Sequence, residues 1–140
     1  MSGTPRAALY SPELLALAVE LANYPYDPTA PFQGEAHSRS CGSTIRLSAS
    51  DDTLGLQVTA CAVGQASAAI FARHFASADT ASIAPGKVQI EAWLTGTGEQ
   101  PDWPDIQMLA PALPYPGRHG AILLPWRAAL DALSKGGAGR

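Results

Sequence analysis

The sequence has few charges, few cysteines and no long apolar run. Charged residues make up 15% of its 140 residues, and the formal net charge is -3. No run of lysine or arginine offers a positive surface to phosphate backbones, so we do not expect a nucleic-acid partner. The longest apolar candidate, residues 58–75, is interrupted by Gln65, Arg73 and His74 and does not match the roughly 20 apolar residues that span a bilayer. We therefore expect no membrane partner.

An export signal is also missing from the first residues. Secretory signals combine a basic start, an apolar stretch and a small-residue cleavage site, whereas Pro12 and Glu13 interrupt the apolar pattern that follows Arg6. We therefore expect a cytoplasmic protein. Two cysteines, Cys41 and Cys61, are too few for a disulfide framework, and the cytosol keeps ordinary thiols reduced. We expect both residues to be thiols or ligands.

Length and composition indicate one globular domain. Hydrophobic residues make up 46% of the chain, enough to bury a core, and 12 prolines with 13 glycines predict many sharp connections. We expect a single domain over residues 1–140, ordered from about residue 10 to residue 134, with flexible ends at 1–8 and 135–140.

The first half of the chain has the pattern of one helix followed by three strands. A helix is expected over residues 12–23, with Ser11 as its cap and prolines just beyond its end. Residues 33–39 are expected to be extended. Residues 43–48 and 54–60 alternate polar with apolar side chains, as half-buried strands do, and the Asp-rich turn between them predicts an antiparallel hairpin.

Helical patterns and breaks dominate the second half. We expect a helix over 63–75, a short helix at 79–83, a break at Pro85-Gly86 before another apolar helix face, a proline-rich passage at 101–116 and a last helix over 124–133. The expected fold class is α+β, in which an N-terminal helix and further helices pack on one face of a small three-stranded antiparallel sheet.

Both cysteines lie at positions suited to metal ligation. Cys61 falls where the hairpin gives way to a helix, and the positive end of a helix dipole favours a thiolate, which binds soft and borderline metals. Gly42 lets the backbone turn tightly after Cys41. Gln65 and Ser67, early in that helix, could stabilise a thiolate or cap the helix. A separation of 20 residues is weak evidence, so spacing alone leaves an incidental role open.

Three segments resemble those of a known family. They are Ser40-Cys41-Gly42-Ser43 before a strand, Ala60-Cys61-Ala62-Val63-Gly64-Gln65-Ala66-Ser67-Ala68 after a strand, and Arg118-His119-Gly120-Ala121-Ile122-Leu123-Leu124-Pro125-Trp126. This order resembles the NifU N-terminal, IscU and SufU family of iron–sulfur cluster assembly scaffolds. Its pattern is Cys-Gly-Asp, then Gly-Cys-Ala-Ile-Ser-x-Ala-Ser-Ala, then Arg-x-Lys-Cys-Ala-x-Leu-Pro-Trp. The resemblance spans most of the chain and implies the same α+β fold.

The chain departs from this pattern at two ligand positions. Ala121 stands where the family has its third cysteine, and Ser43 stands where the family has an aspartate that contacts the metal. A serine hydroxyl is a much poorer ligand than a carboxylate. His119 is then a candidate third metal ligand beside Cys41 and Cys61. A second protomer in a homodimer, a small thiol or a partner protein could instead complete the site.

The resemblance implies a scaffold, not an enzyme. Such a protein would bind iron or an iron–sulfur cluster, or zinc, and would pass its cargo to acceptor apoproteins after a cysteine desulfurase supplies sulfur. The alternative is a degenerate, cluster-free adaptor or sulfur-transfer partner of the desulfurase. The sequence has no Gly-x-Ser-x-Gly elbow, phosphate-binding glycine loop or His-Glu-x-x-His, and His119 is the only plausible base for a cysteine nucleophile.

Overall fold

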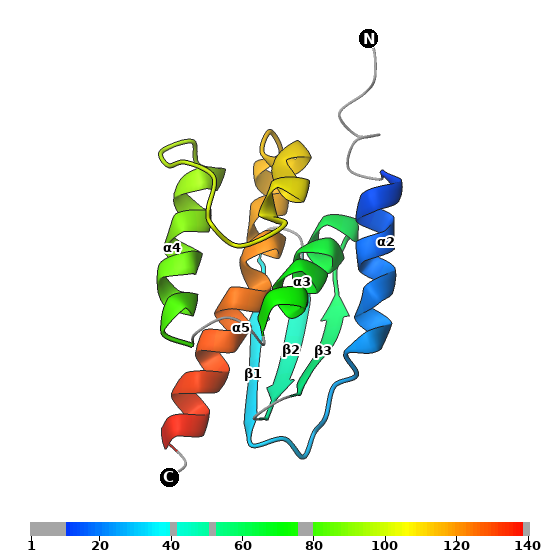
Figure 1. Ribbon diagram of the computed structural model, residues 1–140, viewed down its shortest axis with the longest axis vertical. Helices are drawn as coiled ribbons and strands as arrows, with labels where there is room; N and C mark the ends of the chain where they lie inside the picture. Colours follow the sequence, from blue (N-terminus) through cyan, green and yellow to red (C-terminus); the bar gives the residue numbers. More distant parts are fainter. Residues whose placement is uncertain (1–10, 40–41, 51–52, 76–79, 139–140) are drawn as a thin grey trace.

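The computed structural model describes residues 11–39, 42–50, 53–75 and 80–138, in which one helix precedes three strands and the other helices follow (Figure 1). The α-helices and strands are α2 (Pro12–Glu20), β1 (Phe32–His37), β2 (Thr44–Ala49), β3 (Leu54–Thr59), α3 (Ala62–Phe75), α4 (Ile83–Leu94) and α5 (His119–Ala138). The 3-10 helices are η1 (Leu21–Asn23), η2 (Thr80–Ser82), η3 (Ile106–Ala112) and η4 (Pro116–Arg118). Among the described helices, none combines the length and apolar character needed to cross a membrane.

The three strands form one antiparallel sheet in the order β1, β2, β3. Its register aligns Ala36 of β1 with Ile45 of β2 and Val58 of β3. Ile45 is buried and Val58 packs against the core, because this face of the sheet meets the helices. The predicted α+β fold is therefore confirmed, including the β2–β3 hairpin, whereas the Asp-rich turn at 51–52 lies outside the described residues.

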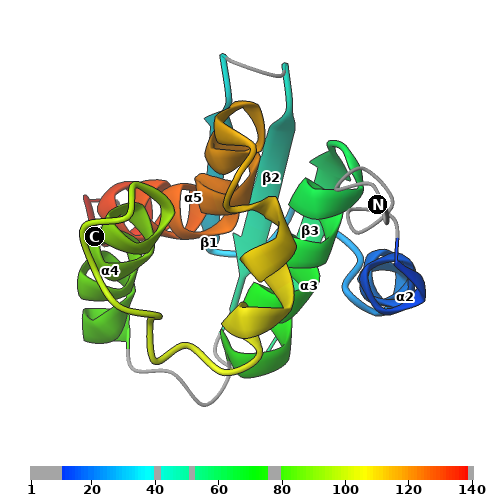
Figure 2. The ribbon, with the colours of Figure 1, turned by 90° about the horizontal axis from the view of Figure 1, so that it is seen from above.

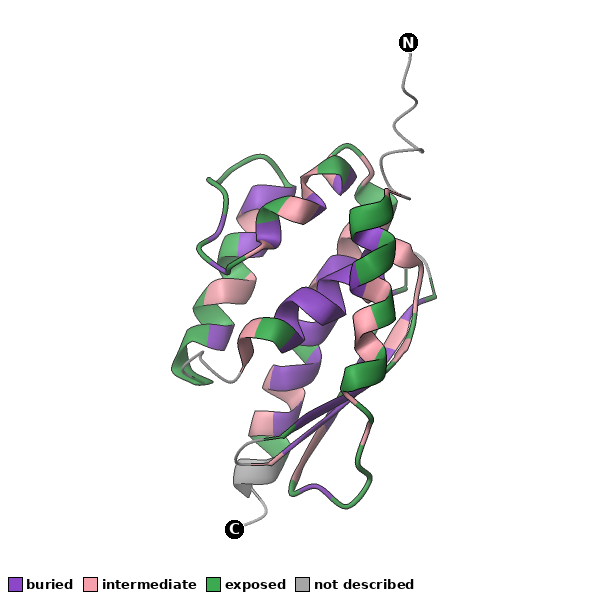
Figure 3. Ribbon diagram, turned by 45° about the vertical axis from the view of Figure 1, so that its right-hand side comes forward, coloured by how far each residue is buried: buried purple, intermediate pink, exposed green. Residues whose placement is uncertain are grey.

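The helices form one layer against that face of the sheet. α3 lies over β3, α5 lies over β1 and β2, α2 packs on α3, and α4 packs on α5. Figures 1 and 2 both place α4 and α2 at opposite sides of the molecule, with α5 and α3 between them. The central position of α3 explains why it is buried along most of its length (Figure 3), with alanine and glycine at many of its positions.

The opposite face of the sheet is polar and is partly covered by the segment after α2. Glu35, Arg46 and Gln57 align across this face, and the Arg46 guanidinium lies 4.5 Å from the centroid of the Tyr26 ring. Gly55 allows the covering segment to approach, since a Cβ there would fall 2.8 Å from Tyr26 Cα. Such contacts are shorter than real Cβ atoms make, so the close approach requires glycine.

The outer edge of β1 is closed by side chains from α5. Gly34 lies directly against the α5 backbone. Beyond Gly34 along β1, the Asp131 carboxylate accepts a 2.9 Å hydrogen bond from the Glu35 N–H, and Arg127 donates one of 3.1 Å to the His37 carbonyl. These bonds satisfy edge groups that would otherwise be open to pairing with another strand.

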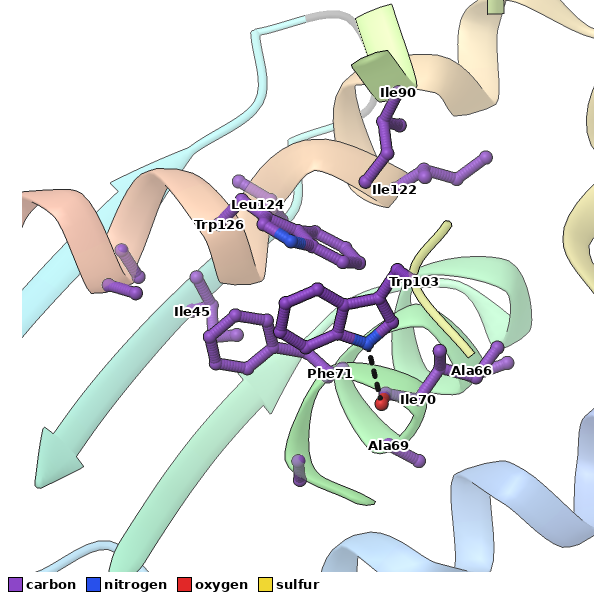
Figure 4. Packing of buried hydrophobic residues seen from close by; sticks show 14 of the residues in the cluster. Ile45, Ala66, Ala69, Ile70, Phe71, Ile90, Trp103, Ile122, Leu124 and Trp126 are labelled. Carbon is purple, nitrogen blue, oxygen red and sulfur yellow. Dashed lines mark hydrogen bonds between the residues drawn. The ribbon is translucent and has the colours of Figure 1, made fainter. Parts of the chain in front are cut away.

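Three aromatic rings occupy the centre of the core. Trp103 stacks on Phe71 with 5.2 Å between ring centroids, and Trp126 meets both rings edge-on at 5.2 Å (Figure 4). Trp126 is fully buried, and Trp93 and Trp103 are also buried. The three tryptophans are therefore core residues.

Two predictions of helix boundaries were wrong. Pro85 and Gly86 lie inside α4 instead of breaking the chain, because Pro85 falls in the first turn, where its missing N–H would have no intrahelical acceptor. The last helix begins at His119, not at Leu124, and contains Pro125. Tertiary packing holds this helix together, since Leu124 and Trp126 on either side of the proline are buried. α5 continues to Ala138, and the expected flexibility of the two ends stays a prediction.

Candidate functional site

The sheet register brings the neighbours of both cysteines to one end of the sheet. His37 ends β1, Thr44 begins β2 and Thr59 ends β3, and Thr44 pairs with both of the other two. Cys61 follows Thr59 by two residues in the chain. Cys41 belongs to the connection between β1 and β2 and itself lies outside the described residues. The sequence positions of the two thiols thus converge on this end of the sheet.

Cys61 occupies the N-terminal cap of α3. Its carbonyl accepts the first hydrogen bond of the helix from the Gln65 N–H at 3.0 Å, and its side chain is half-buried against the core. The Gln65 side chain turns back and donates to the Ala60 carbonyl at 2.8 Å. A thiolate here would face the positive end of a well-formed helix of 14 residues. The Gln65 side chain therefore bonds to the backbone just before Cys61, at the start of the helix, which is similar to the capping role predicted for it.

The described ends of the connection between β1 and β2 form a tight turn. The Ser38 N–H donates to the Ser43 carbonyl at 2.8 Å, and the Gly42 N–H donates to the Ser38 carbonyl at 2.9 Å. Gly42 has a φ of 70°, a left-handed conformation that favours glycine. Ser43, at the family's aspartate position, is buried. The glycine after Cys41 therefore has the conformational role that the sequence predicted.

Ala121, at the family's third cysteine position, packs against the first turns of α3. It is fully buried, and a Cβ placed on Gly64 would lie 3.1 Å from the Ala121 Cβ. The buried Ser67 hydroxyl donates to the Ile122 carbonyl at 2.7 Å and joins the same two helix starts. The position of the missing ligand thus lies against the helix turn that follows Cys61, and a methyl group occupies it.

Ser67 has a different role from the two predicted for it. It neither caps α3 nor stabilises a thiolate, because its hydroxyl is committed to α5. The pairing spans 55 residues of sequence, so no local pattern shows it. The sequence did offer one indication of this contact. Gly64 and Ser67 are small residues on one face of α3, and small side chains let two helices approach closely.

His119 begins α5 and is half-buried. Its Nε2 lies 3.0 Å from the Leu113 carbonyl. A carbonyl oxygen only accepts, so Nε2 carries a proton, and in the neutral imidazole Nδ1 keeps its lone pair. Metal-bound histidines commonly have this arrangement, with the distal N–H bonded to a carbonyl. Within the described ranges, no three His, Cys, Asp or Glu side chains come together as a metal site, and Cys41 lies outside those ranges. The assignment of His119 as a ligand stays a prediction.

An open groove adjoins this end of the sheet. It has a volume of about 680 Å³ and lies between β1 and α5, lined among others by Ser38, Arg39, Gly120 and Arg127. Ser38 begins the connection that contains Cys41, and Gly120 precedes Ala121. Arg118, the family-matched arginine, is half-buried, and its N–H bonds to the Tyr115 carbonyl. The groove makes one flank of the site accessible from solvent.

The main ion-pair network lies at the other end of α3. Arg73 pairs with Glu20 of α2 and, at 3.2 Å, with Asp105, while His74 Nε2 lies 2.8 Å from the same Asp105 carboxylate. The hydrogen bond from Arg73 lowers the pKa of Glu20, and the hydrogen bond from His74 lowers the pKa of Asp105, with Arg73 adding to that effect. His74 therefore belongs to a structural network.

Comparisons with known proteins identify the fold. No family model and no curated protein matches the sequence. The structure is similar to that of a NifU-like protein (N-terminal) from Brucella abortus, with a TM-score of 0.83 and 24% identity over 98% of this chain and 100% of that chain. It is also similar to a SufU from Fervidobacterium islandicum AW-1, named as an iron–sulfur cluster assembly scaffold for the SUF system. That match has a TM-score of 0.75 and 20% identity over 89% of this chain and 96% of that chain. The fold implied by the sequence resemblance is confirmed.

Proposed function

We propose that this protein is an iron–sulfur cluster assembly scaffold that binds iron or a cluster through Cys41 and Cys61 and passes it to acceptor proteins. The observation that carries the proposal is the sheet register, which brings Cys61 and the residues flanking Cys41 to one end of the sheet. The fold shared with a protein named as a SUF-system scaffold supports it.

Two cysteines supply half of the four ligands that a tetrahedral metal or cluster iron needs. His119, two residues before Ala121, is the candidate third ligand, through Nδ1 of its neutral imidazole. A second protomer would supply two more thiolates across a homodimer. Zinc would suit either donor set, since it accepts both sulfur and imidazole nitrogen. The protein would then act by holding and releasing its cargo, without turnover of its own.

A second candidate function is that of a cluster-free adaptor for a cysteine desulfurase. Two observations favour it. Ala121 is fully buried and Ser43 is 4% exposed, so two ligand positions of the family pattern are filled by packed groups. In this role the surface around Cys61 would bind the desulfurase or accept sulfur from it, and no cluster would form.

A reconstitution with a sulfur donor separates the two candidates. The protein is mixed anaerobically with a cysteine desulfurase, cysteine and ferrous iron, and cluster formation is followed by visible absorption. Apo-ferredoxin is then added, and its conversion to the holo form is measured. The scaffold predicts a cluster that appears on the protein and moves to ferredoxin, and Cys61→Ser abolishes both. The adaptor predicts a change in desulfurase rate with no cluster on the protein.

The same assay distinguishes the ways of completing the site. If His119 is a ligand, His119→Ala weakens cluster retention in a monomer. If two protomers share the cluster, its content rises with dimer formation and His119→Ala has no effect. Gel filtration of the loaded protein at several concentrations reads out the difference.

A further inference from the structure

Two adjoining hollows lie between α4 and the segment that follows it. One, of about 330 Å³, is lined by Pro85, Gly86, Gln89, Trp103 and Pro104 among others, and by Asp102. The second, of about 270 Å³, shares Gln89 and Asp102 and adds Glu99. Together they form one surface feature, here named the α4 groove. Its lining includes none of the residues of the candidate metal site.

A buried hydrogen-bond donor lies behind this groove. Trp126 is fully buried, and within the described part of the chain its Nε1 has no acceptor. The neighbouring Trp103 Nε1, in contrast, donates to the Ile70 carbonyl at 3.2 Å, the bond drawn in Figure 4. Buried polar groups are nearly always paired, because an unmade bond to a desolvated donor is costly. We take the unpaired Trp126 N–H as a sign that an acceptor atom of a bound molecule completes this hydrogen bond.

Gly86 leaves room for that acceptor. A Cβ placed on Gly86 would lie 3.7 Å from Trp126 Nε1 and 3.9 Å from its Cδ1, and outside the adjoining α4 backbone no other described heavy atom lies within 4 Å. A methyl-sized notch therefore lies between the Trp126 indole and Gly86, and Gly86 itself lines the groove. An oxygen atom entering from the groove beside Gly86 would reach hydrogen-bond distance of Nε1 once the notch widens slightly.

The charge and shape of the groove indicate the kind of ligand. Glu99 and Asp102 are exposed and make no ion pair with any described residue, which leaves a negative rim. Trp103, Pro85 and Pro104 supply flat apolar walls. Grooves walled by aromatic and proline side chains bind extended, proline-rich peptides, whose backbone carbonyls remain free to accept hydrogen bonds.

We propose that the α4 groove binds an extended, basic peptide segment of a partner protein. A backbone carbonyl of that segment accepts the Trp126 Nε1–H beside Gly86, and a lysine or arginine of the segment lies against Glu99 and Asp102. This docking surface is independent of the cysteines, so it would serve a scaffold and an adaptor equally.

The test uses a random dodecapeptide library displayed on phage, selected on the immobilised full-length protein at low salt. The key variant is Gly86→Ala, which fills the notch at an ordinary van der Waals distance. Alanine is also favoured over glycine inside a helix, so this variant should unfold at the same or a higher temperature than wild type. Lost binding in a protein of equal or greater stability cannot be a folding defect. Asp102→Asn tests the acidic rim.

We expect selected peptides to be rich in lysine or arginine and to bind Gly86→Ala at least tenfold more weakly than wild type. They should also bind Asp102→Asn more weakly than wild type, and their affinity for this variant should depend less on salt concentration. In ¹⁵N-labelled protein, a selected peptide should shift the Trp126 indole N–H signal. Peptides that bind Gly86→Ala as tightly as wild type, or a selected set without basic residues, would overturn the proposal. So would an unmoved Trp126 signal.

Discussion

The close contact between β1 and α5 allows one substitution to test how the site is positioned. In Gly34→Ala, the new methyl group would lie 2.9 Å from Ala132 Cα and closer still to Ala132 N and the Ala128 carbonyl oxygen. All three atoms are α5 backbone and cannot rotate away. Reaching ordinary contact requires α5 to move from β1 by about 1 Å, which a close-packed interior resists.

The magnitude follows from two contributions. Overpacking a well-packed interface costs about 1–3 kcal/mol. The shift would also stretch the charge-assisted bond from the Glu35 N–H to Asp131, a class of bond worth about 1.5–3 kcal/mol, and the more exposed bond from Arg127. We expect a loss of about 3–5 kcal/mol from the free energy of unfolding, a large share of the roughly 5–15 kcal/mol of a whole domain. The melting temperature should fall by about 10–20 °C.

Urea denaturation, followed by tryptophan fluorescence and circular dichroism, measures this loss. Gly117→Ala is the matched control, because a Cβ on Gly117 would meet no heavy atom within 4 Å, and we expect it to stay within about 0.5 kcal/mol of wild type. Metal retention should fall together with stability in Gly34→Ala, since α5 carries His119 and Ala121. A Gly34→Ala protein within about 0.5 kcal/mol of wild type would refute the described packing of α5 on the sheet.

Three further substitutions probe the site and its supports. Ala121→Cys restores the third cysteine of the family pattern, and we expect at least tenfold tighter binding of zinc or iron, measured by competition with a chelator. Ser67→Ala removes a buried hydrogen bond between α3 and α5, and urea denaturation should show a loss of about 1 kcal/mol. Arg73→Gln removes the partner of Glu20 and Asp105, and at pH 7 it should cost about 1 kcal/mol, because these groups are partly exposed.

The pH dependence of the last variant has a definite sign. Carboxylates whose pKa values are lowered by folding stabilise the protein above their unfolded pKa values, and this stabilisation is lost as the pH falls through their folded values. The stability difference between wild type and Arg73→Gln should therefore shrink below about pH 4 and disappear once both carboxyls are protonated in the folded protein. A difference that stays constant down to acid pH would exclude the ion pairs as its cause.

Local patterns predicted the elements that depend on local physics. Ser11 caps α2 with a 3.3 Å bond to the Leu14 N–H, as the Ser-Pro-Glu start indicated. Alternating residues predicted β2 and β3 as an antiparallel pair, which the structure confirms. The helices that contain Pro85 and Pro125 were cut short. The sequence pattern did not show that α4 already begins at Ile83, and it could not show the packing of Leu124 and Trp126 that holds α5 together around Pro125.

The position of Cys61 in the fold was predicted from the sequence, and the tertiary contacts around it were not. Placing Cys61 at a strand-to-helix junction required only the change from a two-residue to a helical period. Two contacts join α3 to α5 beside Cys61: Ser67 with Ile122, and Gly64 with Ala121. Each joins residues more than 50 positions apart, and the periodicity of a single sequence carries no information on such pairs. The hydrogen bond between His119 and the Leu113 carbonyl could not be predicted from the sequence pattern either.

Metal and sulfide analysis of the reconstituted protein tests the central claim most directly. Wild type, Cys41→Ser and Cys61→Ser are purified anaerobically and reconstituted with iron and sulfide, and iron, zinc and acid-labile sulfide are measured per chain. Our account predicts bound iron with sulfide in wild type and its loss in each variant, while urea midpoints of the metal-free proteins stay close together. A wild type that binds no metal, or metal content that neither substitution changes, would contradict the assignment of Cys41 and Cys61 as ligands.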